Sequence, residues 1–167
     1  GPASGDEKRD QESLPENAQA AMSRTDWSRG LTGIERIDGT SVALMNTLIA
    51  SAETASFMPQ STPQLYGILV HKLFANAVRL QGLRGIGYFD VEQTFGDVED
   101  APYGARGSIR TDVVLRNDVG DIIAIYDVKT GNARITNARE RELRLKTRVG
   151  PRVPIIELHI DREFHFK

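Results

Sequence analysis

Two apolar segments separated by a short polar turn constrain the fold of this chain more than any other feature. Residues 109–116 (IRTDVVLR) and 122–130 (IIAIYDVKT) are rich in β-branched side chains, and the NDVGD sequence between them favours a turn. This pattern predicts two antiparallel strands joined as a hairpin. The second segment is apolar almost throughout, which is typical of a central strand that is buried on both faces.

Helices and further strands are predicted on both sides of this hairpin. Apolar spacing and capping signals predict helices at residues 40–57, 61–82 and 136–148, and strands at residues 88–95 and 153–160. We expect Thr40 or Ser41 to cap the first of these helices. The order helix, helix, three strands, helix, strand predicts a mixed sheet flanked by helices, and therefore a mixed α/β fold.

The N-terminal region differs in character from the rest of the chain. Residues 1–33 are polar and lack apolar periodicity, so we expect an irregular linker or arm, followed by a folded domain at residues 34–167. The opening GPASG is typical of the remnant left after removal of a purification tag. We therefore expect the natural protein to be longer than this sequence.

The composition excludes several classes of protein. The longest apolar runs fall well short of the ~20 residues that a helix needs to span a bilayer. The absence of cysteine excludes disulfide frameworks, thiolate metal sites and a cysteine nucleophile. The formal net charge of −2 gives no overall attraction to nucleic acid, so any such binding must come from a local basic patch.

Three charged residues interrupt the two predicted strands of the hairpin. Asp127 and Lys129 are two residues apart and share a face, and the hairpin brings Asp112 within reach of Asp127. Two neighbouring carboxylates repel each other unless a cation lies between them, and a hard ion such as Mg²⁺ or Mn²⁺ suits such ligands. A nearby lysine can orient or help to deprotonate a water, which is chemistry suited to phosphodiester hydrolysis. The alternative is a surface ion pair between Asp127 and Lys129, with Asp112 capping a turn.

The spacing of these residues resembles a known nuclease motif. Asp112 followed by Asp127-Val128-Lys129 on the next strand is similar to the PD-(D/E)xK nuclease superfamily, over roughly residues 62–160. Thr111 stands where that family has proline. The resemblance implies a restriction-endonuclease-like αβββαβ core, with Asp112 and Asp127 as metal ligands, the Val128 carbonyl as a further ligand and Lys129 as the catalytic lysine.

A helical histidine is a further candidate ligand. Gly67 lies one turn before His71 and leaves space beside the imidazole. Members of the superfamily that resemble the RecB nuclease domain carry a histidine on this helix as an additional metal ligand, so the resemblance implies the same for His71. The alternative is a structural histidine packed between Gly67 and Phe74.

Basic residues near the predicted site suggest a nucleic-acid surface. Arg141, Arg144 and Arg148 fall on one stripe of the last helix, and Arg110 precedes Asp112 by two residues. We expect these four to contact the phosphate backbone, with DNA favoured over RNA. The alternative is a solvated helix face with Glu–Arg pairs.

The fuller pattern GSIRTD…IYDVKTGNARIT is similar to nuclease domains carried at the C-terminus of polymorphic toxins of interbacterial competition. This likeness implies a Mg²⁺-dependent toxin that is delivered as part of a larger effector into the cytoplasm of a target cell. It also implies a cognate immunity protein as a partner. The alternative function is a catalytically inactive nuclease-like module that binds nucleic acid or protein.

Overall fold

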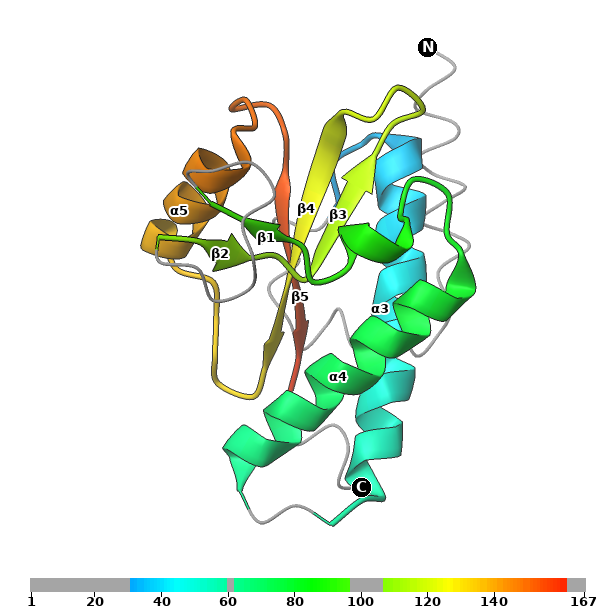
Figure 1. Cartoon of the computed structure of the whole chain (residues 1–167). Helices are drawn as coiled ribbons and strands as arrows, with labels where there is room; N and C mark the ends of the chain where they lie inside the picture. The colour runs from blue at the N-terminus through cyan, green and yellow to red at the C-terminus, as the bar shows by residue number, and fades with distance from the viewer. Residues whose placement is uncertain (1–30, 60–61, 97–106, 162–167) are drawn as a thin grey trace.

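A three-stranded mixed sheet lies at the centre of the fold (Figure 1). The computed structural model describes residues 31–59, 62–96 and 107–161. The sheet has the order β3-β4-β5, formed by Val113–Arg116, Ile122–Thr130 and Ile155–Ile160. β3 is antiparallel to β4, and β5 is parallel to β4. The predicted mixed α/β class is therefore confirmed.

The β3–β4 hairpin forms where the sequence predicts it. The side chain of Asn117 accepts hydrogen bonds from the backbone N–H groups of Val119 and Asp121, and so closes the turn. Val113 pairs with Tyr126 in the antiparallel register. The residue before Val113 therefore stands opposite the residue after Tyr126, which places Asp112 beside Asp127.

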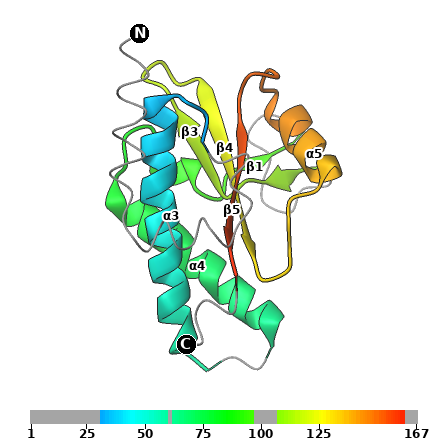
Figure 2. The same ribbon diagram turned by 180° about the vertical axis from the view of Figure 1, so that it is seen from behind.

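Helices cover both faces of the sheet (Figures 1 and 2). α3 (Glu35–Ser56) and α4 (Pro63–Gln81) lie on one face, and α5 (Asn137–Thr147) lies on the other. The main core packs side chains of α3 and α4 against Tyr126 and Val128 of β4, while Ile125 packs with Leu143 of α5 in a second cluster. Because side chains alternate along a strand, Asp127 and Lys129 lie on the α5 face.

The first helix begins earlier than predicted. Thr40 and Ser41 were expected to cap it, but both lie inside α3 and donate their hydroxyl hydrogens to backbone carbonyls one turn back. The carboxylate of Asp38 accepts hydrogen bonds from the backbone N–H groups of Thr32 and Gly33 just before the helix. The second helix agrees with the prediction, because the Thr62 hydroxyl caps its N-terminus and Gly82 follows it in a left-handed conformation.

Two predicted strands are interrupted. The prediction of a strand at 88–95 is wrong for most of its length. Tyr88–Asp90 forms a short 3₁₀ helix, η2, and only Thr94–Phe95 forms a strand, β1. The strand expected at 109–116 is divided into β2 (Ile109–Arg110), which pairs with β1, and β3. The division occurs at Asp112, whose side-chain carboxylate accepts a hydrogen bond from the backbone N–H of Val128 on β4.

None of the helices in the described part of the chain is long and apolar enough to cross a membrane.

Candidate metal centre

A cleft of about 420 Å³ opens beside the β3–β4 hairpin, between α4 and α5. Its walls include all five residues predicted as metal ligands or as the catalytic lysine. The lining comprises His71, Ser108, Ile109, Arg110, Asp112, Asp127, Val128, Lys129, Arg139 and Glu142. The structure therefore brings together Asp112, Asp127, Lys129 and His71, although they come from α4, β4 and the connection between β2 and β3.

His71 is held between two backbone carbonyls. Its Nδ1 lies 2.9 Å from the Gly67 oxygen, and its Nε2 lies 3.0 Å from the Val128 oxygen. Carbonyl oxygens accept hydrogen bonds but cannot donate them, so a neutral imidazole, which carries one hydrogen, can satisfy only one of the two. With that hydrogen on Nδ1, the lone pair of Nε2 faces the oxygen of Val128.

A carboxylate of the same cleft approaches this imidazole. The Oδ1 atom of Asp112 lies 3.9 Å from the Nε2 atom of His71. The imidazole lone pair, the Val128 carbonyl oxygen and the Asp112 carboxylate are all electron-rich. Their approach is favourable when a cation lies among them, either a proton on Nε2 or a metal ion.

Asp112 occupies an environment that disfavours its charge. Burial is the largest effect and raises the pKa of Asp112 to about 6; His71 lowers it, and the neighbouring carboxylate of Asp127 raises it. The Oδ2 atom of Asp112 accepts a hydrogen bond of 2.6 Å from the Val128 N–H. The side chain keeps 22% of its surface exposed toward the cleft, so water or an ion can reach it.

Asp127 is the most deeply buried acid of the site, with 2% of its side chain exposed. Its Oδ2 lies 3.1 Å from Lys129 Nζ, and its Oδ1 lies 3.7 Å from the Arg139 guanidinium. The contact with Lys129 is close but not aligned as a hydrogen bond, so Oδ2 has no hydrogen-bond partner within the described residues. A buried acceptor without an aligned donor is costly, and the charge of the Lys129 ammonium offsets part of that cost.

The donor set fits a hard divalent ion. Two carboxylates, one backbone carbonyl and one imidazole nitrogen surround the cleft, and Mg²⁺ or Mn²⁺ accepts oxygen ligands of this kind while it keeps several waters. Across residues 31–59, 62–96 and 107–161, no three histidine, aspartate or glutamate side chains are gathered closely enough to hold an ion by themselves. An ion bound here therefore needs the Val128 carbonyl and water as further ligands.

The predicted arginines do not form one surface. Arg110 reaches the cleft and forms an ion pair with Glu92 at 3.4 Å, although it belongs to β2 and not to the strand that follows Asp112. Arg141, Arg144 and Arg148 instead line another cleft, together with Leu145 and Val149. Arg144 also donates hydrogen bonds to the carbonyls of Gly150 and Val153, which gives it a structural role.

Arg139 is a site residue that the sequence pattern missed. It lies in the first turn of α5 and donates a hydrogen bond of 3.0 Å to the Arg110 carbonyl, while it also pairs with Asp127 and Glu142. The predicted stripe of arginines lies on the opposite side of the helix. The useful signal is spacing, because Arg139 lies four residues before the apolar Leu143, which packs against β4, and so shares its face of the helix.

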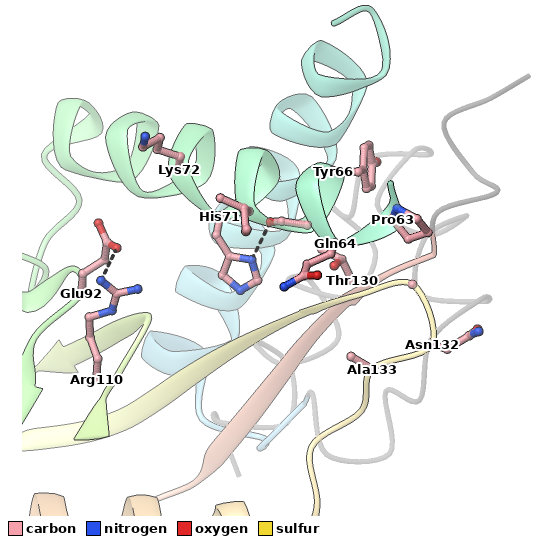
Figure 3. A pocket seen from close by; sticks show the side chains of 13 residues that line it. Pro63, Gln64, Tyr66, His71, Lys72, Glu92, Arg110, Thr130, Asn132 and Ala133 are labelled. Atoms are coloured by element: carbon pink, nitrogen blue, oxygen red, sulfur yellow. Dashed lines mark hydrogen bonds and ion pairs between the residues drawn. The ribbon is translucent and has the colours of Figure 1, made fainter. Parts of the chain in front are cut away.

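A second, larger groove adjoins the cleft (Figure 3). It encloses about 640 Å³ between α4 and the end of β4, and it shares His71 and Arg110 with the cleft. The Glu92–Arg110 ion pair lies at one end of the groove, and Asn132 lies toward the other (Figure 3). A Cβ atom on Gly67 would come within 2.8 Å of Thr130 Oγ1, so glycine permits the close approach of α4 to β4.

Comparison with protein-family profiles, with curated proteins and with solved structures finds no match for this chain.

Proposed function

We propose that this chain is a metal-dependent nuclease that hydrolyses phosphodiester bonds, with DNA favoured over RNA as substrate. The observation that carries the proposal is the meeting of Asp112, Asp127, the Val128 carbonyl and His71 in one cleft, beside Lys129. Electron-rich groups that line one cleft, including a carboxylate oxygen without a hydrogen-bond partner, favour a divalent cation. A cation with an adjacent lysine is suited to phosphodiester cleavage.

The topology supports the same proposal. A helix precedes the strands, an Asp-x-Lys sequence lies on the central strand, and a second aspartate lies beside it at the start of the neighbouring strand. A crossover helix then leads to a parallel strand. This order agrees with a restriction-endonuclease-like core of the PD-(D/E)xK type, which we propose as the finer description of the fold.

The proposed metal ligands are Asp112, Asp127, the Val128 carbonyl and His71, and the ion is Mg²⁺ or Mn²⁺. Such an ion, when bound, stabilises the negative charge that develops on the phosphate and lowers the pKa of a water molecule. In the proposed tautomer, His71 Nδ1 carries the hydrogen and donates it to the Gly67 carbonyl, which leaves the lone pair of Nε2 facing the cleft. Asp112 is held in place by the Val128 N–H.

The charged side chains of the cleft have distinct proposed roles. Lys129 is held 3.1 Å from Asp127 and keeps 25% of its side chain exposed, so its ammonium can orient the attacking water or exchange a proton with it. Arg110 and Arg139 project into the same cleft, where a guanidinium can bind phosphate oxygens through two parallel hydrogen bonds. Their charges also oppose the repulsion between the substrate and the two aspartates.

A binding module without activity is the second candidate. The hydrogen bond from the Val128 N–H to Asp112 and the ion pair between Lys129 and Asp127 give both acids a role in folding. A module of this kind would bind nucleic acid or protein through the same surface. The biological setting that we propose for the active enzyme is a toxin domain within a larger effector, which acts in the cytoplasm of a target cell and is neutralised by an immunity protein.

A cleavage assay separates these two candidates. The protein is incubated with supercoiled plasmid and with total cellular RNA, in Mg²⁺ or in chelator, beside Asp127→Asn and a matched control, Asp118→Asn. Asp118 is an exposed acid in the β3–β4 turn, where it pairs with Arg84. The turn is at the end of the hairpin opposite to Asp112 and Asp127. We expect cleavage that requires Mg²⁺, is lost in Asp127→Asn and is retained in Asp118→Asn. Cleavage of neither substrate in any divalent metal would favour the binding module.

A further inference from the structure

Two large aromatic side chains are exposed next to each other on η2. Tyr88 is 65% exposed and Phe89 is 82% exposed. Their ring centroids lie 5.3 Å apart at an interplanar angle of 80°, so they form one edge-to-face pair. Aromatic rings contribute most to stability or binding when their surface is buried against other groups. An adjacent exposed pair is therefore a candidate site for a partner with flat faces.

The pair is held by a charged side chain that is itself fixed. The guanidinium of Arg79 lies 5.0 Å from the centre of the Tyr88 ring. Arg79 is anchored by an ion pair of 3.2 Å with Glu92 and by a hydrogen bond of 3.1 Å to the Val91 carbonyl. The aromatic cleft beside it encloses about 380 Å³, which is room for more than one small ring. Little ordering of side chains is needed before a ligand stacks here.

This aromatic cleft is connected to the candidate metal centre. Glu92 lines both the aromatic cleft and the groove of Figure 3, and it bridges Arg79 and Arg110. The backbone N–H of Glu92 donates a hydrogen bond of 2.9 Å to the carbonyl of Asp112. Two residues separate Phe89 from Glu92, and the three residue steps between them span at most about 10 Å when the chain is extended. The aromatic pair therefore lies within a few nucleotide steps of the cleft that would hold the scissile phosphate.

We propose that Tyr88 and Phe89 stack unpaired nucleobases of the substrate, so that the preferred substrate is a single strand or a locally unpaired region. This inference rests on the proposed nuclease function. Bases inside a duplex are covered on both faces by their neighbours, whereas unpaired bases stack on exposed aromatic rings. Arg79 and Arg110 place two positive charges along the path from the rings to the cleft, and Glu92 between them balances one. The remaining positive charge suits a phosphate backbone better than an apolar protein surface.

The test is a binding measurement in the presence of a chelator, which prevents metal-dependent cleavage of the oligonucleotide. Fluorescence anisotropy is recorded with a labelled single-stranded oligonucleotide of mixed sequence and with the same strand in a duplex. Phe89→Leu and Tyr88→Leu remove the flat faces but keep apolar side chains. Phe57→Leu is the matched control, because Phe57 is 88% exposed at the end of α3 and lines none of the clefts described above.

Stacking on one aromatic ring predicts that single-strand affinity falls roughly 5- to 100-fold in Phe89→Leu, with a much smaller change for the duplex. Phe57→Leu is expected to bind like the wild type. Equal single-strand affinity in Phe89→Leu and wild type would overturn the inference and leave the aromatic pair as a protein-docking surface. A loss of the same size for single strand and duplex would also overturn it.

Failure of the nuclease assignment has a separate signature. Hydrolysis of bis(4-nitrophenyl) phosphate, a small diester without a nucleobase, is measured for the wild-type protein in Mn²⁺. Absence of hydrolysis together with Phe89-dependent binding of the single strand contradicts the enzyme but supports stacking. Hydrolysis together with binding that is independent of Phe89 supports the enzyme and contradicts stacking.

Discussion

The Nε2 atom of His71 lies 3.0 Å from the carbonyl oxygen of Val128, and this contact joins α4 to the central strand at the candidate metal centre. The carbonyl of Gly67 fixes the other side of the imidazole, one turn earlier in the same helix. The absence of a side chain at Gly67 lets the helix approach Thr130 on β4. The position of the proposed ligand therefore depends on a helical glycine.

Alanine at Gly67 is expected to disturb both packing and metal binding. Its Cβ would lie 2.8 Å from Thr130 Oγ1, so α4 or Thr130 must move, and His71 moves with the helix. Gly39→Ala is the matched control, because Gly39 is also inside a helix but has no neighbour within 4 Å of the added Cβ. We expect Gly39→Ala to raise the free energy of unfolding by about 0.5–1 kcal/mol through helix propensity.

Gly67→Ala is not expected to show this increase in the free energy of unfolding, because of the contact with Thr130 Oγ1. It is also expected to bind Mn²⁺ more weakly than Gly39→Ala. Chemical denaturation in chelator and a Mn²⁺ titration measure the two effects. Equal stability and equal Mn²⁺ affinity in the two variants would contradict the role given to the contact between α4 and β4.

Lys129→Ala is expected to lower turnover much more than substrate binding. Removal of a group that orients or exchanges a proton with the attacking water costs typically 10²- to 10⁴-fold in rate. Lys129→Arg keeps the positive charge beside Asp127 but does not release a proton near neutral pH, so its rate separates electrostatic support from proton transfer. Single-turnover cleavage and anisotropy binding provide the two measurements. Turnover that persists in Lys129→Ala removes its proposed role.

The pH dependence of stability should depend on Asp112. Its pKa is raised from 3.8 to about 6 in the folded protein, so between these values the folded state binds more protons than the unfolded state. In chelator, the free energy of unfolding contributed by Asp112 therefore falls as the pH rises through this window. The loss is on the order of 1–3 kcal/mol, toward the lower end because the side chain reaches solvent.

Asp112→Asn removes this titration and keeps an oxygen that can accept the Val128 N–H. Denaturation in chelator on both sides of pH 6 is expected to show the variant gaining stability relative to the wild type as the pH rises. Mg²⁺ should reverse the trend, because it favours the ionised carboxylate. A constant difference across this range would show that the environment of Asp112 does not disfavour its charge.

Local signals explain the parts of the fold that the sequence predicts well. The turn at Asn117 and the cap at Thr62 each depend on side chains within four residues of the backbone they bind. Alternation along β4 also places Asp127 and Lys129 on one face without knowledge of the rest of the chain. The same alternation and the short turn bring Asp112 beside Asp127.

Contacts between distant residues explain the parts that differ. The predicted strand at 109–116 divides because Asp112 binds the backbone of Val128, sixteen residues away in sequence. The predicted arginine stripe misses the cleft because it lies on the side of α5 away from Arg139, where Arg144 binds carbonyls beyond the end of the helix. Arg139 enters the site through its contact with the Arg110 carbonyl, and helical spacing alone does not contain that information.

The most direct test of the proposed metal centre is a Mn²⁺ titration followed by electron paramagnetic resonance, which measures the free ion as the protein binds it. The wild type and Asp118→Asn are compared with Asp127→Asn, which keeps the size of the buried side chain but removes its charge. We predict that the wild type and Asp118→Asn bind Mn²⁺ at one site that Asp127→Asn has lost. Equal Mn²⁺ binding by Asp127→Asn and the wild type, or no binding by the wild type, would contradict the account.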